Sequence, residues 1–535
     1  MYRKGSLCSA IAVVILSIMW NARDETVWAS PSACPIYPDI DVIRDGSTPS
    51  QVIQSKEIQD ALKEVDILLN QAVSTIPTGL VATVVFDQTT MWTKGYGWND
   101  ASNKSQGPPT RNSLVRIASI TKVFTSVLLY AMRDRSLVSL HDPLDQYLAN
   151  FSMKLMSDED MITLRELASH TSGMPRELPY PCSGFDYQRD GCNETKVLSV
   201  LRDHAVVSAS HRRFHYSNLG FALLGRALAH ALSVDTSDNG DSLSYEALIA
   251  RYVTEPLGMT NATFAYNDTT KERSAKGTTS PDGTPVQIPD GPTCGFEAPA
   301  GCLWASASDM ERLMKFLFRI DALEQSHGRQ KSDDPFDAST IAEIMAPVIL
   351  LRNGFQAIGT PFEMEYILGK YWTKGKQGEL PGYRSSVTVI EDLKLGVFTS
   401  AFVSDVEDSS VWTLPILKIL APALDTVLTR SSALPSTYKE YLGRYYDGSV
   451  TVSVVNETNL IFVPGNDATP LRLVSVPGLT RVLRAVDVVQ MGCRWLDDGT
   501  DQELVRFLWD DPSEDNSSGF VRGMQFMGAQ YDKIL

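Results

Sequence analysis

The sequence has no run of lysines or arginines, and its formal net charge is −16. A general nucleic-acid-binding protein needs a basic patch to neutralise phosphates, so this composition argues against that class of protein. The chain also lacks internal repeats and low-complexity tracts. Its residue usage is that of an ordinary globular protein, and its 535 residues are enough for more than one domain and a large core.

Metal-binding spacings are absent as well. No C-x-x-C pair is present, and no histidine lies at ligand distance from a cysteine, so we expect neither a metal nor another cofactor. Seven cysteines occur, and six remain once Cys8 in the N-terminal apolar run is set aside. An even number suits an oxidising compartment. Other connectivities stay open, but the short spacings favour the pairs Cys182–Cys192, Cys294–Cys302 and, by remainder, Cys34–Cys493.

Residues 1–29 have the pattern of a secretory signal peptide. A short basic region precedes an apolar run of about a dozen residues, Cys8 to Met19, which is too short to cross a bilayer comfortably. Val27-Trp28-Ala29 offers a small-residue cleavage pattern, and an uncleaved anchor is the competing interpretation. No later stretch is expected to span a bilayer. We therefore expect a secreted, extracellular protein without membrane contact after cleavage.

Asn-x-Ser/Thr acceptors support the same compartment. Any one of them could arise by chance, but together with a signal peptide they indicate a secreted glycoprotein. The acceptors are Asn103, Asn150, Asn193, Asn261, Asn267, Asn456 and Asn516.

Hydrophobic periodicity divides the rest of the chain into two predicted domains, at residues 50–428 and 436–535. The first is α/β: a helix over 55–74, a strand pair over 79–98, a mostly helical middle, and a second hairpin over 385–400. Beyond a linker, short alternating runs predict a small all-β domain, barrel-like or sandwich-like.

The stretch RIASITKVFTSVL, Arg116 to Leu128, has the pattern of a helix that is apolar on nearly every face, yet it contains Lys122 one turn after Ser119. Two structural explanations are available: Ser119 caps the helix, and Lys122 extends its ammonium to solvent. The apolar surroundings instead favour a chemical explanation for Lys122 beside Ser119. Burial lowers the pKa of a lysine and makes it a usable proton acceptor, and residues three apart on a helix face each other. A hydroxyl, an adjacent base and a helix N-terminus together make an acylation site.

Two further motifs follow along the chain. Tyr216-Ser217-Asn218 precedes an apolar helix-forming run, and it is the only Tyr-x-Asn in the sequence. A tyrosine between cations could relay protons, and the asparagine could hold a substrate amide or the lysine. A capping asparagine and a packing tyrosine are the alternative interpretation of this motif. Lys376-Gln377-Gly378 stands at the entry to the second predicted hairpin.

In this order, Ser-x-x-Lys, Tyr-x-Asn and Lys-x-Gly resemble the motifs of the serine β-lactamase and penicillin-binding-protein superfamily, on its class C side. The segments ITLRELASHTSGMP, EPLGMTNATF and AGCLWASASDM are similar to family segments, and the likeness covers roughly residues 50 to 425. The C-terminal domain resembles the appended domain of secreted fungal β-lactamase-like proteins. The resemblance implies a β-lactamase/transpeptidase-like fold: an antiparallel sheet flanked by helices, plus a mostly helical subdomain.

The resemblance also implies roles for individual residues. Ser119 would be the nucleophile, Lys122 its general base, and Tyr216 the residue that passes protons to the leaving group. Asn218 would orient the substrate and Lys122. Lys376 would lie on the strand that flanks the cleft, and the oxyanion hole would use the backbone N–H groups of Ser119 and Glu379.

One departure from the family pattern concerns Gly378 and Glu379. Gly378 would let the substrate approach the backbone, but the next residue, usually small, is here an acidic side chain. We expect Glu379 to neutralise Lys376 and to disfavour carboxylate-bearing substrates such as β-lactams.

These predictions describe a secreted serine hydrolase that acts through a covalent acyl-enzyme on a small-molecule ester, amide or lactam. An acyltransferase using the same intermediate and a catalytically silent binding protein are the alternatives. The sequence does not indicate an oligomeric state.

Overall fold

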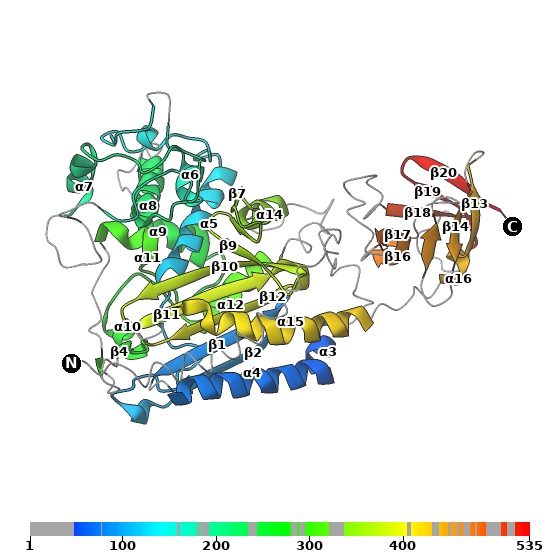
Figure 1. Ribbon diagram of the computed structural model, residues 1–535, viewed down its shortest axis with the longest axis horizontal. Coiled ribbons are helices and arrows are strands. Elements are labelled where there is room, and N and C mark those ends of the chain that lie inside the picture. The colour runs from blue at the N-terminus through cyan, green and yellow to red at the C-terminus, as the bar shows by residue number, and fades with distance from the viewer. Residues whose placement is uncertain are drawn as a thin grey trace. The chain divides into compact units, whose positions relative to one another are not determined.

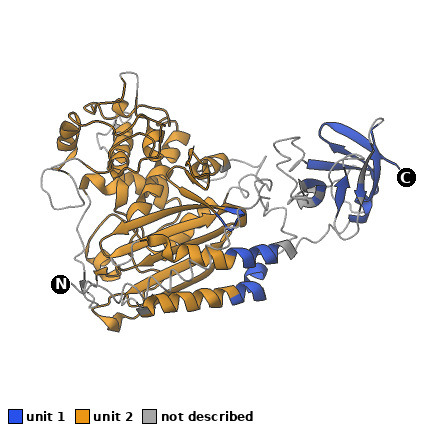
Figure 2. Cartoon of the chain, viewed as in Figure 1, with its two compact units in different colours: residues 1–60, 367–371, 421–535 blue, residues 61–366, 372–420 orange. Residues whose placement is uncertain are grey.

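The computed structural model describes the chain from residue 48 to residue 534 with internal gaps. The described ranges are 48–75, 78–157, 161–178, 182, 192–233, 243–279, 286–287, 295–319, 336–403, 408–430, 438–447, 451–455, 460–463, 471–476, 479–487, 504–510 and 519–534. The predicted signal peptide and the acceptors Asn456 and Asn516 lie outside them. The chain divides into two compact units (Figure 2), one formed by residues 61–366 and 372–420 and the other by residues 1–60, 367–371 and 421–535.

A large sheet forms the centre of the first unit (Figure 1). Its described strands number eight and run in the order β2-β1-β12-β11-β10-β9-β8-β7. The strands are β1 (Gly79–Phe86), β2 (Thr89–Gly97), β7 (Ile349–Leu350), β8 (Gln356–Ile358), β9 (Glu363–Ile367), β10 (Tyr371–Leu380), β11 (Tyr383–Ile390) and β12 (Leu395–Ala401). Because β1 and β12 are buried at every position, both faces of the sheet must be covered.

Helices cover the two faces, and alternating side chains of the β1–β2 hairpin contact one layer each. On one face Thr83 and Thr93 donate hydrogen bonds to the Glu311 carboxylate of α12 (Ala307–Leu317). On the other, Lys94 and Tyr96 bond to Asp66 of α4 (Lys56–Thr75). Helix α15 (Thr413–Arg430) lies along the same face as α4 (Figure 1). This sandwich confirms the predicted α/β class, with its antiparallel sheet and flanking helices.

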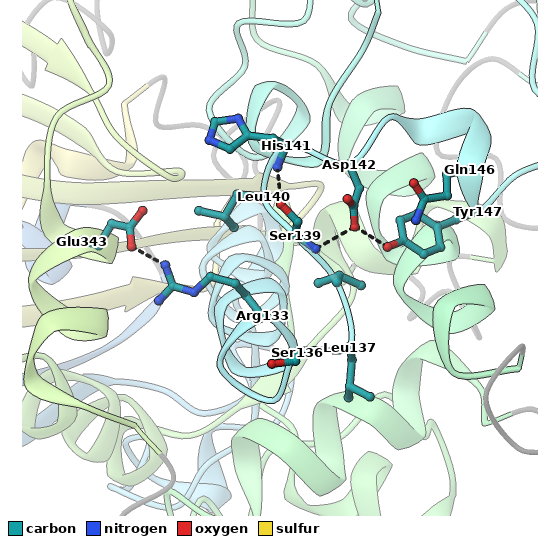
Figure 3. Close-up of a pocket in the computed structure, with 11 residues that line it drawn as sticks. Arg133, Ser136, Leu137, Ser139, Leu140, His141, Asp142, Gln146, Tyr147 and Glu343 are labelled. Atoms are coloured by element: carbon teal, nitrogen blue, oxygen red, sulfur yellow. Dashed lines mark hydrogen bonds and ion pairs between the residues drawn. The ribbon is translucent and has the colours of Figure 1, made fainter.

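The remaining helices belong mostly to a helical subdomain over the α12 face. In the described part of the chain they are α5 (Thr121–Asp134), α6 (Leu164–Ala168), α7 (Glu194–Leu201), α8 (Asn218–Ser233), α9 (Tyr245–Ile249), α10 (Asp268–Arg273), α11 (Ala298–Gly301), α14 (Ala338–Met345) and, in the other unit, α3 (Pro49–Gln54) and α16 (Tyr438–Tyr441). The end of α5 that carries Arg133 borders an open cavity of about 670 Å³ (Figure 3).

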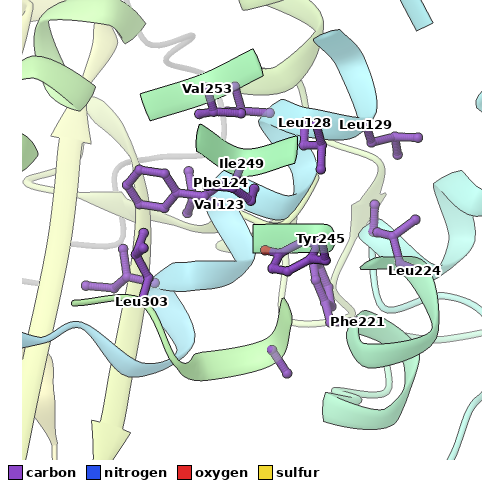
Figure 4. Packing of buried hydrophobic residues seen from close by; sticks show 14 of the residues in the cluster. Val123, Phe124, Leu128, Leu129, Phe221, Leu224, Tyr245, Ile249, Val253 and Leu303 are labelled. Carbon is purple, nitrogen blue, oxygen red and sulfur yellow. The ribbon is translucent and has the colours of Figure 1, made fainter. Parts of the chain in front are cut away.

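Helix α5 is the central element of this subdomain. Every residue from Thr121 to Met132 is buried, as the all-round apolar pattern predicts. Phe124 and Leu128 pack among Phe221 of α8, Tyr245 of α9 and Leu303 (Figure 4). The helix begins five residues later than predicted, because a short extended segment, β3 (Val115–Arg116), and a 3₁₀ turn, η2 (Ala118–Ile120), precede it. Ser119 is therefore held in a turn just ahead of the α-helix.

The C-terminal strands close into a barrel, which confirms the predicted all-β character of this region. Five of its strands coincide with predicted ones, and β13, β19 and β20 were not predicted. The eight described strands are β13 (Gly443–Tyr446), β14 (Thr451–Val455), β15 (Ile461–Val463), β16 (Leu471–Val476), β17 (Leu479–Asp487), β18 (Leu504–Trp509), β19 (Val521–Phe526) and β20 (Ala529–Ile534). Aromatic side chains fill its interior, among them the tilted pair Tyr441 and Phe507 and the edge-to-face pair Phe462 and Phe526.

One described segment, Ser409–Leu428, is long and apolar enough to cross a membrane by length and composition. We expected no such segment beyond the N-terminus. Ile416, Leu417, Leu420 and Leu424 are fully buried, and they recur at helical spacing along one stripe of α15. This burial is the pattern of a core helix.

The cysteines and glycan acceptors can be followed in part. Cys182 and Cys192 form a disulfide, as predicted. Cys302 is disulfide-bonded too, whereas its expected partner Cys294 and the pair Cys34–Cys493 lie outside the described residues. Asn261 differs from the other described acceptors, which are exposed: its amide nitrogen donates to Ser306 and Ser308. A glycan on Asn261 would leave one N–H on this nitrogen, so at least one of the two bonds would be lost.

We expect peptide mapping under non-reducing conditions to recover three linked pairs: Cys182–Cys192, Cys294–Cys302 and Cys34–Cys493. The last would close the longest loop and contribute the most of the three in chain-entropy terms. A free thiol at any of these six positions would contradict the scheme, and reduction of the mapped sample serves as the control.

Candidate active site

Ser119 lies at the surface end of an otherwise buried segment. Its neighbours Ala118 and Ile120 are buried, while Ser119 itself is partly exposed. Ala118 has a positive φ of 50°, a left-handed conformation that is unusual for a residue with a Cβ and costs about 1 kcal/mol or more. Ile117 and Ile120 are the N-cap residues of η2 and α5, and neither provides a side-chain cap. Ser119 makes no capping bond either. The capping explanation for Ser119 is therefore not supported.

Lys122 is completely buried, which excludes the solvent-reaching explanation for it. Its Nζ lies 3.2 Å from Ser119 Oγ, 2.7 Å from Asn218 Oδ1 and 2.5 Å from the carbonyl oxygen of Ala300. Burial lowers the pKa of Lys122, with a further contribution from the Lys376 charge and against the opposing effect of Tyr216. The arrangement holds an amine of reduced basicity against the hydroxyl.

Glu177 fixes the orientation of Asn218. Asn218 Nδ2 donates to both carboxylate oxygens of Glu177 at 3.0 Å, so Oδ1 must face Lys122. Glu177 in turn lies 3.1 Å from Arg176 Nε. Asn218 is 3 % exposed, and it thus serves as a fixed acceptor for Lys122.

Tyr216 approaches Ser119 from the other side. Its hydroxyl donates to Ser119 Oγ at 2.7 Å, and its ring lies within 5.0 Å of Lys122 Nζ, Lys376 Nζ and the Arg176 guanidinium. Burial by itself would raise the pKa of Tyr216, but the charges of Lys122 and Lys376 outweigh it and bring the pKa below the usual 10.0. The prediction placed this tyrosine between two cations, and the structure brings those groups together.

His170 supports the Tyr216 ring from behind. The two rings are stacked with centroids 4.5 Å apart. His170 Nδ1 accepts the backbone N–H of Ser217 at 3.0 Å, so the neutral ring carries its proton on Nε2. Burial and the nearby lysine charges lower the pKa of His170 well below 6.5. His170 is therefore a neutral platform rather than a second base.

Lys376 lies on β10, and its ion-pair partner is not the predicted one. Its Nζ is 2.6 Å from Glu363 Oε1 on the neighbouring strand β9. Glu379 is exposed on β10, three positions from Lys376, and side chains at odd separation on a strand point to opposite faces. Burial alone would lower the pKa of Lys376, but Glu363 and then Tyr216 raise it, and Glu379 contributes least. The expectation that Glu379 neutralises Lys376 is thus corrected: Glu363 does so.

Gly378 is required by the protein's own backbone. A Cβ built there would lie 2.1 Å from the carbonyl oxygen of Ile117 and 3.1 Å from the nitrogen of Ser119. Any side chain would push β10 away from the turn that carries the nucleophile. Gly378 was predicted to let the substrate approach the backbone. The structure adds a second role, the close packing of β10 against the Ser119 turn. Glu379 is the next residue on β10, so its backbone directly follows the residue that contacts the Ser119 turn.

A second carboxylate, that of Glu297, interacts with Lys122. Glu297 is the last residue of the 3₁₀ turn η5 (Gly295–Glu297), just before α11. It is 3 % exposed, and its Oε1 has no hydrogen-bond partner in the described part of the chain. Burial raises the pKa of Glu297 to about 7, helped by repulsion from Glu177 and opposed by Lys122. Ionised Glu297 is therefore disfavoured in the folded state.

We expect Glu297→Gln to stabilise the protein above neutral pH. Because the folded-state pKa of Glu297 is raised above its ordinary 4.5, the native protein loses stability as pH rises from about 4.5 to 7. The glutamine variant should avoid this loss, gaining about 3 kcal/mol at most at pH 8 and nothing at pH 4. Chemical denaturation at both values measures it.

Glu311→Gln is the matched control with the opposite sign. Burial would raise the pKa of Glu311, but Arg111, Thr90 and Thr93 outweigh it and lower the pKa. Because its folded-state pKa is lowered, ionised Glu311 stabilises the folded protein above the ordinary pKa of a glutamate, and this stability is lost in acid. Glu311→Gln should therefore destabilise the protein at pH 8. A Glu297→Gln variant that is less stable than the native protein at pH 8 would contradict the assignment.

The cavity at the other end of α5 is a separate feature. It is lined by residues such as Arg133, Asp142, Tyr147 and Glu343, and none of the predicted site residues contributes to it (Figure 3). A helix of this length separates it from Ser119 by about 20 Å. Among the described residues, no group of three His, Cys, Asp or Glu side chains is placed to hold a metal ion.

Several contributors to the site were not predicted: His170, Arg176, Glu177, Glu297, Glu363 and the Ala300 carbonyl. His170 and Ala300 lie in segments that resemble the family, and Glu177 follows one of them by two residues, so these segments carried a usable signal. Glu363 had none, because its contact with Lys376 depends on strand pairing.

This fold and this cluster are those of a serine β-lactamase-like protein. The Beta-lactamase family model matches residues 69–408, and the chain belongs to that family. It is 30% identical over 511 residues to Beta-lactamase-like protein 2 of Dictyostelium discoideum, covering 89% of this chain and 86% of the relative. It is also 34% identical over 189 residues to the D-alanyl-D-alanine-carboxypeptidase/endopeptidase AmpH of Escherichia coli, covering 35% of this chain and 45% of the relative.

Solved structures show the same fold at low identity. The octameric penicillin-binding protein homologue from Pyrococcus abyssi superposes with a TM-score of 0.56 at 19% identity, covering 88% of this chain and 100% of that one. A class C β-lactamase superposes with a TM-score of 0.53 at 16% identity, covering 71% of this chain and 98% of the other. The predicted superfamily and fold are confirmed.

Proposed function

We propose that this member of the β-lactamase-like serine hydrolase superfamily is a secreted enzyme that forms an acyl-enzyme at Ser119 and hydrolyses a small neutral ester, amide or lactone. One observation carries the proposal: Ser119 Oγ receives Lys122 Nζ at 3.2 Å and the Tyr216 hydroxyl at 2.7 Å. A nucleophile between a base and a proton donor is the arrangement that acyl transfer needs. The disulfide between Cys182 and Cys192 supports an oxidising, extracellular location.

Burial favours the neutral form of Lys122 as the base, and the acceptors around it orient its lone pair. A neutral amine has two N–H groups, and two oxygens are in place for them: Asn218 Oδ1 and the Ala300 carbonyl. The amine lone pair then faces Ser119 Oγ. Ser119 gives its proton to Lys122 as Oγ bonds to the substrate carbonyl carbon. The backbone N–H groups of Ser119 and Glu379 are proposed to bind the developing oxyanion.

Tyr216 completes the cycle. When the tetrahedral intermediate collapses, the bond to the leaving group breaks, Tyr216 gives its proton to that group, and the proton on Lys122 restores the tyrosine. A water molecule then attacks the acyl carbon and gives a proton to Tyr216 as the tyrosine passes its own proton to the neutral Lys122, which later returns it to Ser119 Oγ; the lowered pKa of Tyr216 favours this relay. Carboxylic acid leaves, and Ser119 regains its proton.

The charge balance favours neutral substrates. Lys376, the cation beside Tyr216, is already paired with Glu363, and Arg176 with Glu177. No unpaired cation among these groups is left to attract a substrate carboxylate. We therefore expect neutral acyl esters to be turned over faster than penicillins, cephalosporins or peptides with a free C-terminal carboxylate.

Stopped-flow mixing with p-nitrophenyl butyrate tests the proposal. An acyl-enzyme predicts a burst of p-nitrophenol or, if deacylation is fast, steady hydrolysis that partitions to a butyrate ester when a small alcohol is added. A product mixture dominated by the alcohol ester would favour an acyltransferase. Absence of both burst and turnover across ester, amide and lactam substrates would support a silent binding protein instead.

A further inference from the structure

The ion pair between Lys376 and Glu363 is asymmetric in its exposure. The Lys376 side chain is 2 % exposed and that of Glu363 is 35 % exposed. Lys376 Nζ is further occupied by the carbonyl oxygen of Gln377 at 3.2 Å and by the face of the Tyr216 ring at 5.0 Å. A molecule that enters beside Tyr216 therefore meets the carboxylate of the pair, not its ammonium.

We propose that Glu363 sets the charge preference of the site. It occupies the position on Lys376 that a substrate carboxylate would need, so the site discriminates against anionic acyl groups and accepts neutral or cationic ones. The opposite charges of Lys376 and Glu363 attract each other strongly at the dielectric of a partly buried site. A substrate anion could therefore bind Lys376 only by displacing the Glu363 carboxylate. The inference rests on the proposed hydrolase function and names a residue that determines its substrate class.

The other charged groups near the site do not supply the same effect. Glu379 points away from the face that carries Lys376, and Glu177 is held by Asn218 and Arg176. Arg176 has an exposed side chain that an anionic substrate could reach, but it already faces Glu177. The free oxygen of Glu363 is left to accept a hydrogen bond from a substrate hydroxyl, amide or ammonium group.

Three p-nitrophenyl esters of matched acyl length test the proposal: the butyrate, the hemisuccinate and the 4-trimethylammoniobutyrate. For the native protein, kcat/KM for the hemisuccinate should fall at least ~10-fold below that for the butyrate, and the cationic ester should equal or exceed the butyrate. Added salt should narrow these differences. A native protein that prefers the hemisuccinate would overturn the proposal without any mutagenesis.

Glu363→Gln should raise the hemisuccinate-to-butyrate ratio by ~10-fold or more, because Lys376 becomes available to the substrate carboxylate. The double variant Glu363→Gln with Lys376→Met should lose that gain, and using a ratio removes any general loss of catalysis. Glu365→Gln, two residues along the same strand, is the control for removing a charge and should leave the ratio within ~2-fold.

An unchanged ratio in Glu363→Gln, or a larger change in Glu379→Gln, would contradict the role of Glu363. The proposed function fails separately: in that case a fluorophosphonate does not label Ser119 and no ester is cleaved. If Ser119 is labelled but the esters are not cleaved, the same ratio is read from their protection against labelling.

Discussion

Replacing Ser119 with alanine is expected to lower kcat by ~10⁴-fold or more while leaving the free energy of unfolding nearly unchanged. Ser119 Oγ is the atom that Lys122 and Tyr216 both contact, and its side chain makes no capping bond for α5. Activity on p-nitrophenyl butyrate and urea-induced unfolding measure the two halves of the expectation.

Ser126→Ala is the matched control, because Ser126 lies on the same helix, is fully buried, and has a hydroxyl without a hydrogen-bond partner in the described part of the chain. It should keep full activity and lose no stability. Activity retained in Ser119→Ala would contradict the mechanism, and loss of folding would revive the capping explanation.

Lys122→Met is expected to abolish turnover, with a loss of at least ~10³-fold, yet to be at least as stable as the native protein. The variant removes a completely buried amine whose ionised form is penalised by burial, and methionine has a similar shape. The cost is two unpaired acceptors, Asn218 Oδ1 and the Ala300 carbonyl, which offsets part of the gain.

Lys315→Met provides the comparison. Lys315 lies on α12, is partly buried, and also has a pKa lowered first by burial, but it contacts none of the proposed catalytic groups. That variant should keep its activity. Retained activity in Lys122→Met would mean that Tyr216 acts as the base without the lysine.

The parts of the fold and site that depend on local sequence were predictable. The buried helix with one internal amine, the strand pair over 79–98 and most C-terminal strands follow from periodicity. The same is true of the three motifs. Their resemblance to the family motifs predicts that Ser119, Tyr216 and Lys376 are neighbours, and Tyr216 does contact both of the other two.

What escaped prediction depends on which side chains strand pairing brings together. Glu363 reaches Lys376 because β9 pairs with β10, the next strand along the chain, and that pairing was not part of the prediction. Glu379 was predicted to neutralise Lys376 because the two residues are close in sequence. That inference fails on a strand, where side chains alternate between the two faces. The stretch over 409–428 shows the same limit, since composition alone does not separate a core helix from a membrane span.

The most direct test of the central claim is to treat the folded protein with a fluorophosphonate probe and map the modified peptide by mass spectrometry. We expect one adduct, on Ser119, whose formation is lost in Ser119→Ala, strongly slowed in Lys122→Met, and unaffected in Ser126→Ala. No adduct at Ser119 in a correctly folded native protein, or equal labelling of the Lys122→Met variant, would contradict the account.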